Sequence, residues 1–263
     1  NKEFKDQYLN QEIDGINSIP KLNKSIEFVD VFFSYGSDYP DVIKGINIEI
    51  PAFTSVAFVG SSGAGKSTIA DLISLIIRPQ RGEIFIDGKS MNEIKLREWR
   101  KQIAYVSQDT VIFDTTIANN ISMMNLNQLD YNIYNRVITS AKKAFIHDFI
   151  DTLPNGYNTM VGERGLKLSG GEKQRIGIAR TILKDASIML LDESTSSLDY
   201  TTEKKILANL KKDKKNSTMI VISHRLSSIT DVDKIIVLNF GKIIEQGTHL
   251  ELMNAKGEYF KLW

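Results

Sequence analysis

Residues 60–68 read Gly60-Ser61-Ser62-Gly63-Ala64-Gly65-Lys66-Ser67-Thr68 and match the pattern G-x-x-x-x-G-K-S. The apolar run Ser55–Val59 comes directly before this stretch, and an amphipathic run from Ile69 to Ile77 follows it. The two flanks predict a strand, a glycine-rich turn and a helix, the structural context that turns the pattern into a phosphate-binding site. A flexible Gly/Ser loop that matched by chance would not carry both flanking elements.

Each part of this stretch has a chemical task. The glycines let the loop fold back, so that successive backbone N–H groups point inward at an anion. The helix that begins near Lys66 adds the positive end of its dipole at the same place. Lys66 supplies an ammonium group for the outer phosphates, and Ser67 offers its hydroxyl to Mg²⁺. We therefore predict that all nine residues, from Gly60 to Thr68, bind a nucleotide.

The composition is that of an ordinary globular protein with a sizeable core. The chain has 263 residues, of which 42% are apolar and 25% are charged. Its 33 basic and 32 acidic residues give a net charge of +1, so no basic field points to nucleic acid as a partner. The absence of cysteine excludes disulfides and thiolate chemistry. No apolar run approaches the roughly 18 residues of a membrane-spanning helix.

The order of the apolar runs predicts an α/β protein with additional parts. Residues 1–24 are polar and weakly periodic, and we interpret them as a linker. Closely spaced strand patterns from residue 25 to 58 predict an antiparallel patch. Strands that alternate with helices in the second half predict a parallel sheet covered on both faces. Between Thr116 and Thr152 the spacing is helical, with no strand pattern.

A second candidate site is the run Ser187–Glu193, in which four apolar residues end in two carboxylates. The apolar part predicts a central strand, so Asp192 and Glu193 would emerge at its carboxyl end, where open α/β sheets bind ligands. Asp192 suits the shell of Mg²⁺, directly or through water. Glu193 would face the other way and polarise a water for attack on a γ-phosphate. The alternative is a capped strand end with two solvated acids, and the phosphate loop upstream disfavours it.

The stretch Leu168–Arg175, with the sequence L-S-G-G-E-K-Q-R, predicts a second helix whose start can bind an anion. Ser169 is a suitable N-cap, and the glycines after it allow an anion to approach free backbone N–H groups. One nucleotide does not need two such helix starts from one chain. We therefore expect Ser169, Gly170, Gly171 and Glu172 to contact a nucleotide held by another copy. A plain helix start with a serine cap is the alternative.

Together these motifs resemble the nucleotide-binding domain of an ATP-binding-cassette (ABC) transporter, from about Ser25 onward. Four more residues match motifs of that family, in the family's order. By resemblance, Tyr35 stacks on adenine, Gln108 is the Q-loop glutamine, Asp199 belongs to the D-loop and His224 is the switch histidine. A lone histidine after a strand is more often a core or edge residue, so the argument rests on the whole set.

The resemblance implies a fold, namely an α/β P-loop NTPase of the RecA-like type. It has a mostly parallel sheet with helices on both faces, plus an antiparallel β subdomain and an α-helical subdomain. We expect a linker from a membrane domain at 1–24 and the nucleotide-binding domain at 25–263. The parts of that domain would be the antiparallel β subdomain at about 25–58, the RecA-like core at about 59–108 and 168–246, the helical subdomain at about 109–167, and a C-terminal helix at about 248–263.

The resemblance also implies ATP hydrolysis, with ATP and Mg²⁺ as cofactors. Two copies would pack head to tail around two ATP molecules. Because every motif is intact, a homodimer is the first expectation, and a heterodimer is left open. Glu193 would polarise the attacking water, and His224 would hold the γ-phosphate in line. By this resemblance the catalytic residues are Glu193, His224, Gln108 and Lys66, the Mg²⁺ ligands are Ser67, Gln108 and Asp192, and Asp199 communicates between the copies.

Three stretches resemble exporter cassettes in particular: Val161–Gly165, which is similar to the X-loop, then His224–Ser227, and finally Gly247–His249. Exporter subunits fuse a six-helix membrane domain ahead of the cassette, so residues 1–24 would be the remnant of that connection. The resemblance therefore implies a motor domain that drives transport of a substrate across a membrane. It would act at the cytoplasmic face of the cell membrane, together with the transmembrane domain of the same chain.

Four residues depart from the family pattern, and none of them removes a catalytic group. Glu172 stands where Gln is most common and adds a negative charge near the partner's nucleotide. Met160 stands where many exporters have an acidic residue, which concerns the coupling to the membrane domain. The other two departures are Ser197 in place of Ala and Gly36 in place of Pro.

A soluble, non-transport ABC ATPase is the main alternative. Such proteins insert a long coiled coil between the two anion sites, or carry two cassettes in one chain. Here residues 110–167 are too few and lack sustained heptads, and only one cassette is found. A regulatory module without hydrolysis would lack the base, whereas Glu193 is present. An unrelated P-loop kinase would lack the run Ser169–Arg175.

Overall fold

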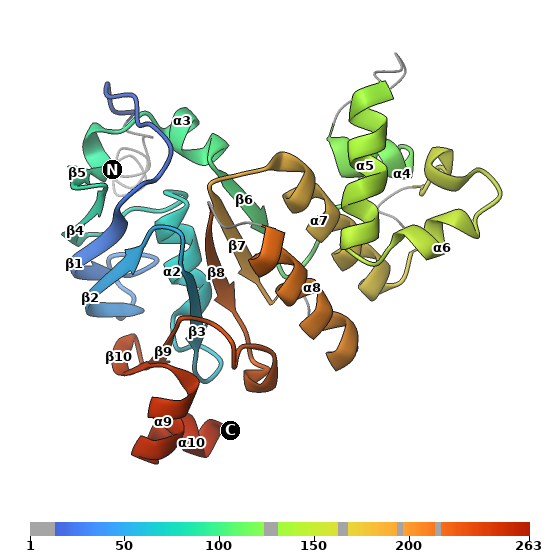
Figure 1. Ribbon diagram of the computed structural model, residues 1–263. Helices are drawn as coiled ribbons and strands as arrows, with labels where there is room; N and C mark the ends of the chain where they lie inside the picture. The colour runs from blue at the N-terminus through green and yellow to red at the C-terminus, as the bar shows by residue number, and fades with distance from the viewer. Residues whose placement is uncertain (1–13, 124–130, 163–167, 194–196, 214–216) are drawn as a thin grey trace.

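The structure is a computed structural model that describes residues 14–123, 131–162, 168–193, 197–213 and 217–263. Its larger sheet has six strands (Figure 1). In spatial order these are β10 (Lys242–Gly247), β9 (Lys234–Asn239), β3 (Ser55–Val59), β8 (Thr218–Ile222), β7 (Ile188–Asp192) and β6 (Ile103–Val106). All neighbours are parallel except β10, which pairs antiparallel with β9. The predicted mostly parallel sheet is confirmed.

The central strands are apolar throughout because both faces of this sheet are covered. Every residue of β3, β7 and β8 is buried. Alternate side chains of β3 enter different hydrophobic cores, with Ala57 and Val59 in one and Val56 and Phe58 in the other. The sheet therefore separates two hydrophobic cores. The carboxyl ends of its parallel strands lie together at one edge of the sheet.

On the Phe58 side, the core is closed by α2 (Lys66–Ile73) and by a second sheet. This sheet is antiparallel, with the order β2 (Ile43–Pro51), β1 (Ser25–Phe33), β4 (Arg81–Ile86) and β5 (Lys89–Ser90). We expected the antiparallel part within about residues 25–58. The structure adds β4 and β5 to it, because Ile26 of β1 pairs with Ile86, a long-range register that no local pattern encodes.

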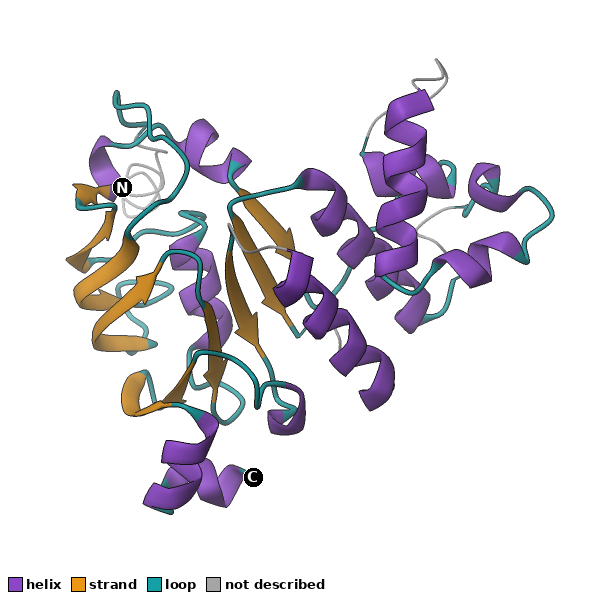
Figure 2. Cartoon of the chain, viewed as in Figure 1, coloured by secondary structure: helices purple, strands orange, loops and turns teal. Residues whose placement is uncertain are grey.

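On the Ala57 side, the core is closed by helices. These are α7 (Gly170–Lys184) and α8 (Tyr200–Asp213), and farther along the same core α4 (Ile117–Ser122), α5 (Tyr131–Lys143) and α6 (His147–Asp151). Figure 2 shows that the helical part lies at one end of the molecule and the antiparallel sheet at the other. Within the described residues, the helical character predicted between Thr116 and Thr152 is confirmed.

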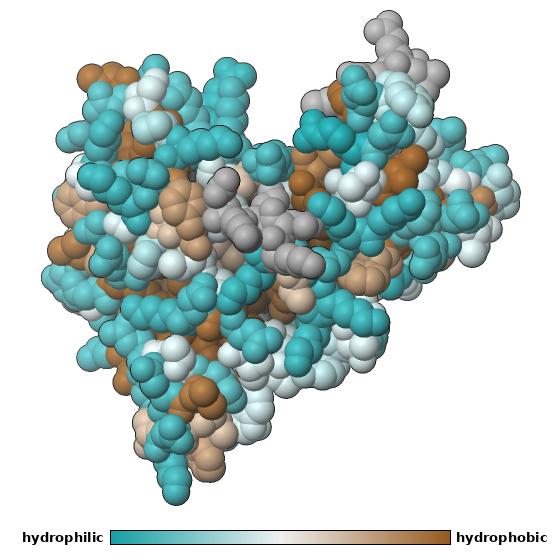
Figure 3. All heavy atoms as spheres, viewed as in Figure 1, coloured by the Kyte–Doolittle hydropathy of each residue, from teal (hydrophilic) through white to brown (hydrophobic). Residues whose placement is uncertain are grey.

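The space-filling view shows a hollow between the part around α3 (Leu96–Lys101) and the part around α5 (Figure 3). Residues 14–24, predicted as part of a linker, lie against the α3 side. The N–H groups of Gly15 and Asn17 donate to the carbonyl oxygens of Ile94 and Glu93, at 3.1 and 2.8 Å. This part of the predicted linker is therefore fixed to the domain, and residues 1–13 lie outside the described residues.

The C-terminal segment at about 248–263, predicted as one helix, forms two. The first, α9 (His249–Ala255), ends where Lys256 adopts a φ of 52°, and α10 (Glu258–Leu262) follows. In the part of the chain that the structure describes, no helix has both the length and the apolar character needed to cross a membrane.

Candidate functional site

The loop between β3 and α2 lies at the carboxyl end of β3, so the predicted strand, turn and helix are confirmed. Gly60, Gly63 and Gly65 have φ angles of 146°, 76° and 102°, a region that favours glycine. A Cβ atom on Gly60 would lie 2.1 Å from the carbonyl oxygen of Leu238. The close approach of β9 to the loop therefore requires glycine at position 60.

Lys66 reaches back along this loop. Its Nζ donates to the carbonyl oxygens of Gly60 and Ser61, at 3.0 and 2.9 Å. Burial lowers the pKa of Lys66, and the charges of Glu193 and Asp192 partly offset that effect. A phosphate oxygen is a stronger acceptor for an ammonium group than a neutral carbonyl oxygen. The side chain is thus placed at the loop and can exchange its present partners for a phosphate.

Asp192 and Ser67 meet at the same edge of the sheet. The Ser67 hydroxyl donates to Asp192 Oδ1 at 3.3 Å. Burial raises the pKa of the Asp192 carboxyl, and hydrogen bonds from Ser67 and Tyr105 partly offset this. One hydroxyl and one carboxylate fit Mg²⁺, which takes few protein ligands and completes its shell with phosphates and water. Among the described residues no cluster of three His, Cys, Asp or Glu side chains could hold a metal without such help.

Gln108, the third predicted Mg²⁺ ligand, follows β6 and is exposed. No hydrogen bond joins its side chain to Ser67 or Asp192 within the described ranges, so its place in the metal shell stays a prediction. The sequence analysis missed Tyr105, whose hydroxyl donates to Asp192 Oδ2 at 3.3 Å. Its role depends on β6 pairing with β7, which the sequence did not reveal.

The two predicted catalytic side chains, Glu193 and His224, are in direct contact. His224 Nε2 lies 2.6 Å from Glu193 Oε1. The contact follows from the sheet, because Glu193 comes after β7 and His224 after the neighbouring parallel strand β8. The N–H of Glu193 also donates to the carbonyl oxygen of Ile222 at 3.0 Å. A carboxylate beside an imidazole can accept a proton from water once the two groups separate enough to admit that water.

Tyr35 is placed beside the last residue of the phosphate loop. Its hydroxyl lies 3.1 Å from Thr68 Oγ1, and its ring meets that of Phe33 edge to face at 5.0 Å. The side chain is 61% exposed. An aromatic ring that is fixed at its hydroxyl and open to solvent offers a surface for a planar base, as the stacking prediction requires.

The start of α7 is built by a reciprocal pair of hydrogen bonds. Ser169 Oγ accepts from the N–H of Glu172 at 3.3 Å, and Glu172 Oε2 accepts from the N–H of Ser169 at 2.7 Å. This is a capping box, and its S-x-x-E pattern was readable in the sequence. Glu172, which departs from the family's Gln, therefore has a structural task. Gly170 and Gly171 carry no side chain that could block the other N–H groups of the first turn.

The two helix starts that suit an anion lie on opposite sides of the large sheet. Ile69 and Leu72 of α2 belong to the core with Phe58, whereas Ile176 and Ala179 of α7 belong to the core with Ala57. The start of α2 belongs to the loop at residues 60–68, on one side of the sheet. The start of α7 in the same chain lies on the other side of the sheet.

The remaining predicted residues have local partners. Asp199 is exposed, and its Oδ1 accepts from the N–H of Thr202 at 3.0 Å. Hydrogen bonds from the side chain and the backbone of Thr202 lower the pKa of the Asp199 carboxyl. Met160 is exposed and its backbone pairs with that of Thr116. The stretch Val161–Gly165 is described only up to Gly162.

Comparisons with known proteins show which family the chain resembles. A family model described as "ABC transporter" matches residues 43–196. The chain is 45% identical over 247 residues to "Iron-sulfur clusters transporter ABCB7, mitochondrial" of Oryzias latipes, covering 94% of this chain and 32% of that protein. It is 43% identical over 252 residues to "ATP-dependent lipid A-core flippase" of Idiomarina loihiensis, covering 95% of this chain and 43% of that protein.

A solved structure, "Structure of a bacterial Atm1-family ABC exporter with ATP bound", matches with a TM-score of 0.90 and 41% identity. The match covers 100% of this chain and 46% of the other. The chain thus spans 32% to 46% of the length of these three proteins.

Proposed function

Because the chain belongs to the ABC transporter family, of which it is the ATPase domain, we propose that it is the motor of an exporter. Two copies close head to tail around two ATP molecules, and their closure drives a substrate across a membrane. The matched relatives are more than twice as long as this chain, which supports a membrane domain connected to it. The motor would then work at the cytoplasmic face of that membrane.

The observation that carries the proposal is the placement of α2 and α7 on opposite sides of one sheet. In a head-to-tail pair, residues 60–68 of one copy face Ser169–Glu172 of the other, so each ATP lies between them. The start of α7 contributes a partial charge of about +0.5, which attracts the terminal phosphate. ADP lacks that phosphate, so ATP closes the pair and ADP does not.

Within such a site, each residue acts from the position described above. Lys66 exchanges the carbonyl oxygens of Gly60 and Ser61 for phosphate oxygens. Ser67, Asp192 and Gln108 would hold Mg²⁺, which would neutralise negative charge that develops on the phosphate oxygens. Glu193 takes a proton from the attacking water. His224 leaves its direct contact with Glu193 and holds the γ-phosphate, which makes room for that water between them.

Gel filtration in a hydrolysis-deficient background, Glu193→Gln, tests this proposal. We expect ATP with Mg²⁺ to convert the chain from monomer to dimer, because the γ-phosphate bridges the two copies. We expect ADP with Mg²⁺ to leave it monomeric at the same concentration. Equal dimerisation in ADP, or no dimerisation in ATP, would contradict the proposed site.

A further inference from the structure

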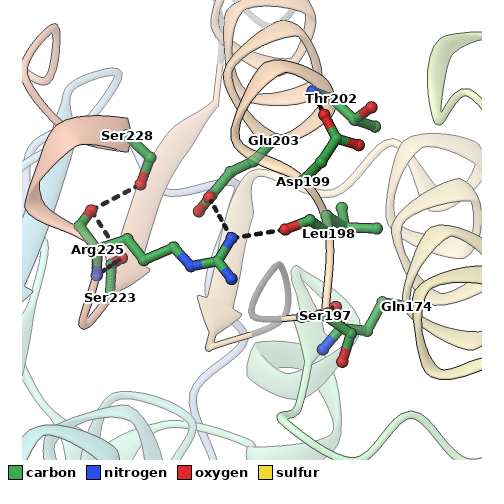
Figure 4. A network of polar contacts seen from close by, with 9 residues as sticks. All are labelled: Gln174, Ser197, Leu198, Asp199, Thr202, Glu203, Ser223, Arg225 and Ser228. Carbon is green, nitrogen blue, oxygen red and sulfur yellow. Dashed lines mark hydrogen bonds and ion pairs between the residues drawn. The ribbon is translucent and has the colours of Figure 1, made fainter.

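A cluster of polar contacts joins three segments that are distant in sequence (Figure 4). The segments are α7, the chain around residues 197–203, and the loop at 223–228 that carries His224. We call this set the Arg225 cluster, and its members are Gln174, Ser197, Leu198, Asp199, Thr202, Glu203, Ser223, Arg225 and Ser228.

Arg225 lies at the centre of this cluster. Its Nη1 donates to the carbonyl oxygen of Leu198 at 2.6 Å and lies 3.3 Å from Glu203 Oε2. The Glu203 side chain is only 1% exposed. A carboxylate that is out of water needs a charged partner, so Glu203 holds the guanidinium where it can bond Leu198. The side chain of Arg225 therefore ties its own loop to the backbone at residue 198.

The backbone of Arg225 is fixed as well. Ser223 Oγ accepts from the N–H of Arg225 at 2.9 Å and donates to its carbonyl oxygen at 3.2 Å. Ser228 Oγ donates to the same carbonyl oxygen at 2.8 Å. His224 thus lies between Ser223 and Arg225, and the Ser223 side chain is hydrogen-bonded to the Arg225 backbone. These bonds therefore hold the backbone next to His224 in place.

On its other side, the segment at 197–198 lies against the start of α7. Gln174, buried in α7, accepts from the N–H of Ser197 at 2.9 Å. A Cβ atom on Gly170 would lie 3.2 Å from Ser197 Oγ, and one on Gly171 would lie 3.2 Å from the carbonyl oxygen of Ser197. The first turn of α7 therefore contacts the same short segment that Arg225 holds.

We infer that Arg225 is a positioning residue that links the start of α7 to His224 within one copy. The inference rests on the proposed function, in which the start of α7 binds the partner's ATP and His224 serves the copy's own ATP. The link then runs from Ser169–Glu172 to residues 197–198, then through Arg225 to His224. Binding of the partner's ATP at the start of α7 would thereby set the position of His224 at the copy's own ATP.

The test is steady-state ATP hydrolysis by the double variant Arg225→Gln/Glu203→Gln. This variant removes both charges together and leaves no buried carboxylate unpaired, so we expect it to fold. We expect kcat to fall about tenfold or more, the effect of losing a charge-assisted hydrogen bond that fixes a catalytic group. The KM for ATP should stay within about twofold, because no group of the cluster is in the phosphate loop.

Lys211→Gln is the matched control, because it breaks another ion pair of α8, with Asp233 at 3.2 Å, outside the cluster. Its kcat should equal that of the unchanged chain. Suppose that the control and the unchanged chain both hydrolyse ATP. If the double variant then keeps its kcat, or changes only by a higher KM, the inference is overturned and the proposed function stands. If the unchanged chain does not hydrolyse ATP, the proposed function itself fails.

A second measurement tests the link to α7 separately. Gln174→Met removes the acceptor for the N–H of Ser197 from the α7 side. The combined variant carries Gln174→Met together with Arg225→Gln/Glu203→Gln. If both changes act through the segment at 197–198, the fold-loss in kcat of the combined variant is smaller than the product of the two separate fold-losses. A loss equal to that product would mean independent action, and it would overturn the link between α7 and His224.

Discussion

Replacing Glu193 by Gln is expected to lower ATP turnover by roughly 10²- to 10⁴-fold, the usual contribution of a general base. The amide keeps the size of the side chain and can still accept from His224, whose Nε2 lies 2.6 Å from Glu193 Oε1. It cannot take a proton from water. Lys66 and the rest of the loop at 60–68 are unchanged, so ATP should bind as in the parent chain.

Two measurements on the same preparation separate these effects. Calorimetry gives the affinity for ATP, and phosphate release gives kcat. Glu49→Gln serves as a control, because Glu49 is an exposed acid on β2 in the antiparallel sheet. Hydrolysis near the rate of the parent chain by Glu193→Gln would reject Glu193 as the base.

Replacing Ser169 by Asp is expected to abolish ATP-driven dimerisation. Aspartate is as good an N-cap as serine, so the start of α7 and the partner bond to the N–H of Glu172 are retained. The new carboxylate, however, would face the γ-phosphate of the partner's ATP. The repulsion between the carboxylate and the γ-phosphate should weaken the dimer by about 10²-fold or more.

Ser169→Asn is the matched control, since asparagine caps equally well and carries no charge. Both variants are compared by sedimentation in the Glu193→Gln background, with ATP binding to single copies measured alongside. We expect binding to be unchanged in both and dimerisation to be lost only with Asp. A Ser169→Asp chain that dimerises as the parent does would remove Ser169 from the composite site.

The sequence alone predicted those parts of the site that depend on neighbouring residues. The strand, loop and helix around Gly60–Thr68 are one continuous segment, so their order and chemistry could be read directly. The acids after β7 were predicted for the same reason. The helix α2 nevertheless ends at Ile73, earlier than the apolar pattern to Ile77 suggested, because Leu75 adopts a φ of 52°.

Contacts between distant segments could not be predicted in this way. The addition of β4 to the antiparallel sheet, the bond from Tyr105 to Asp192 and the ties of Arg225 all depend on which strands and loops become neighbours. The periodicity of a segment predicts whether it forms a helix or a strand, but not which other segment packs against it. The direct contact of His224 with Glu193 likewise required the parallel pairing of β7 and β8.

The central claim is that each ATP site needs residues from two copies, and mixing two inactive variants tests it most directly. Lys66→Ala disables the phosphate loop but keeps Ser169 at the start of α7. Ser169→Asp keeps the phosphate loop but disables the start of α7. We expect neither variant to hydrolyse ATP alone. In an equal mixture, half of the pairs are mixed and each contains one intact site, so up to about a quarter of the original rate should return. A mixture as inactive as its two components would contradict the claim.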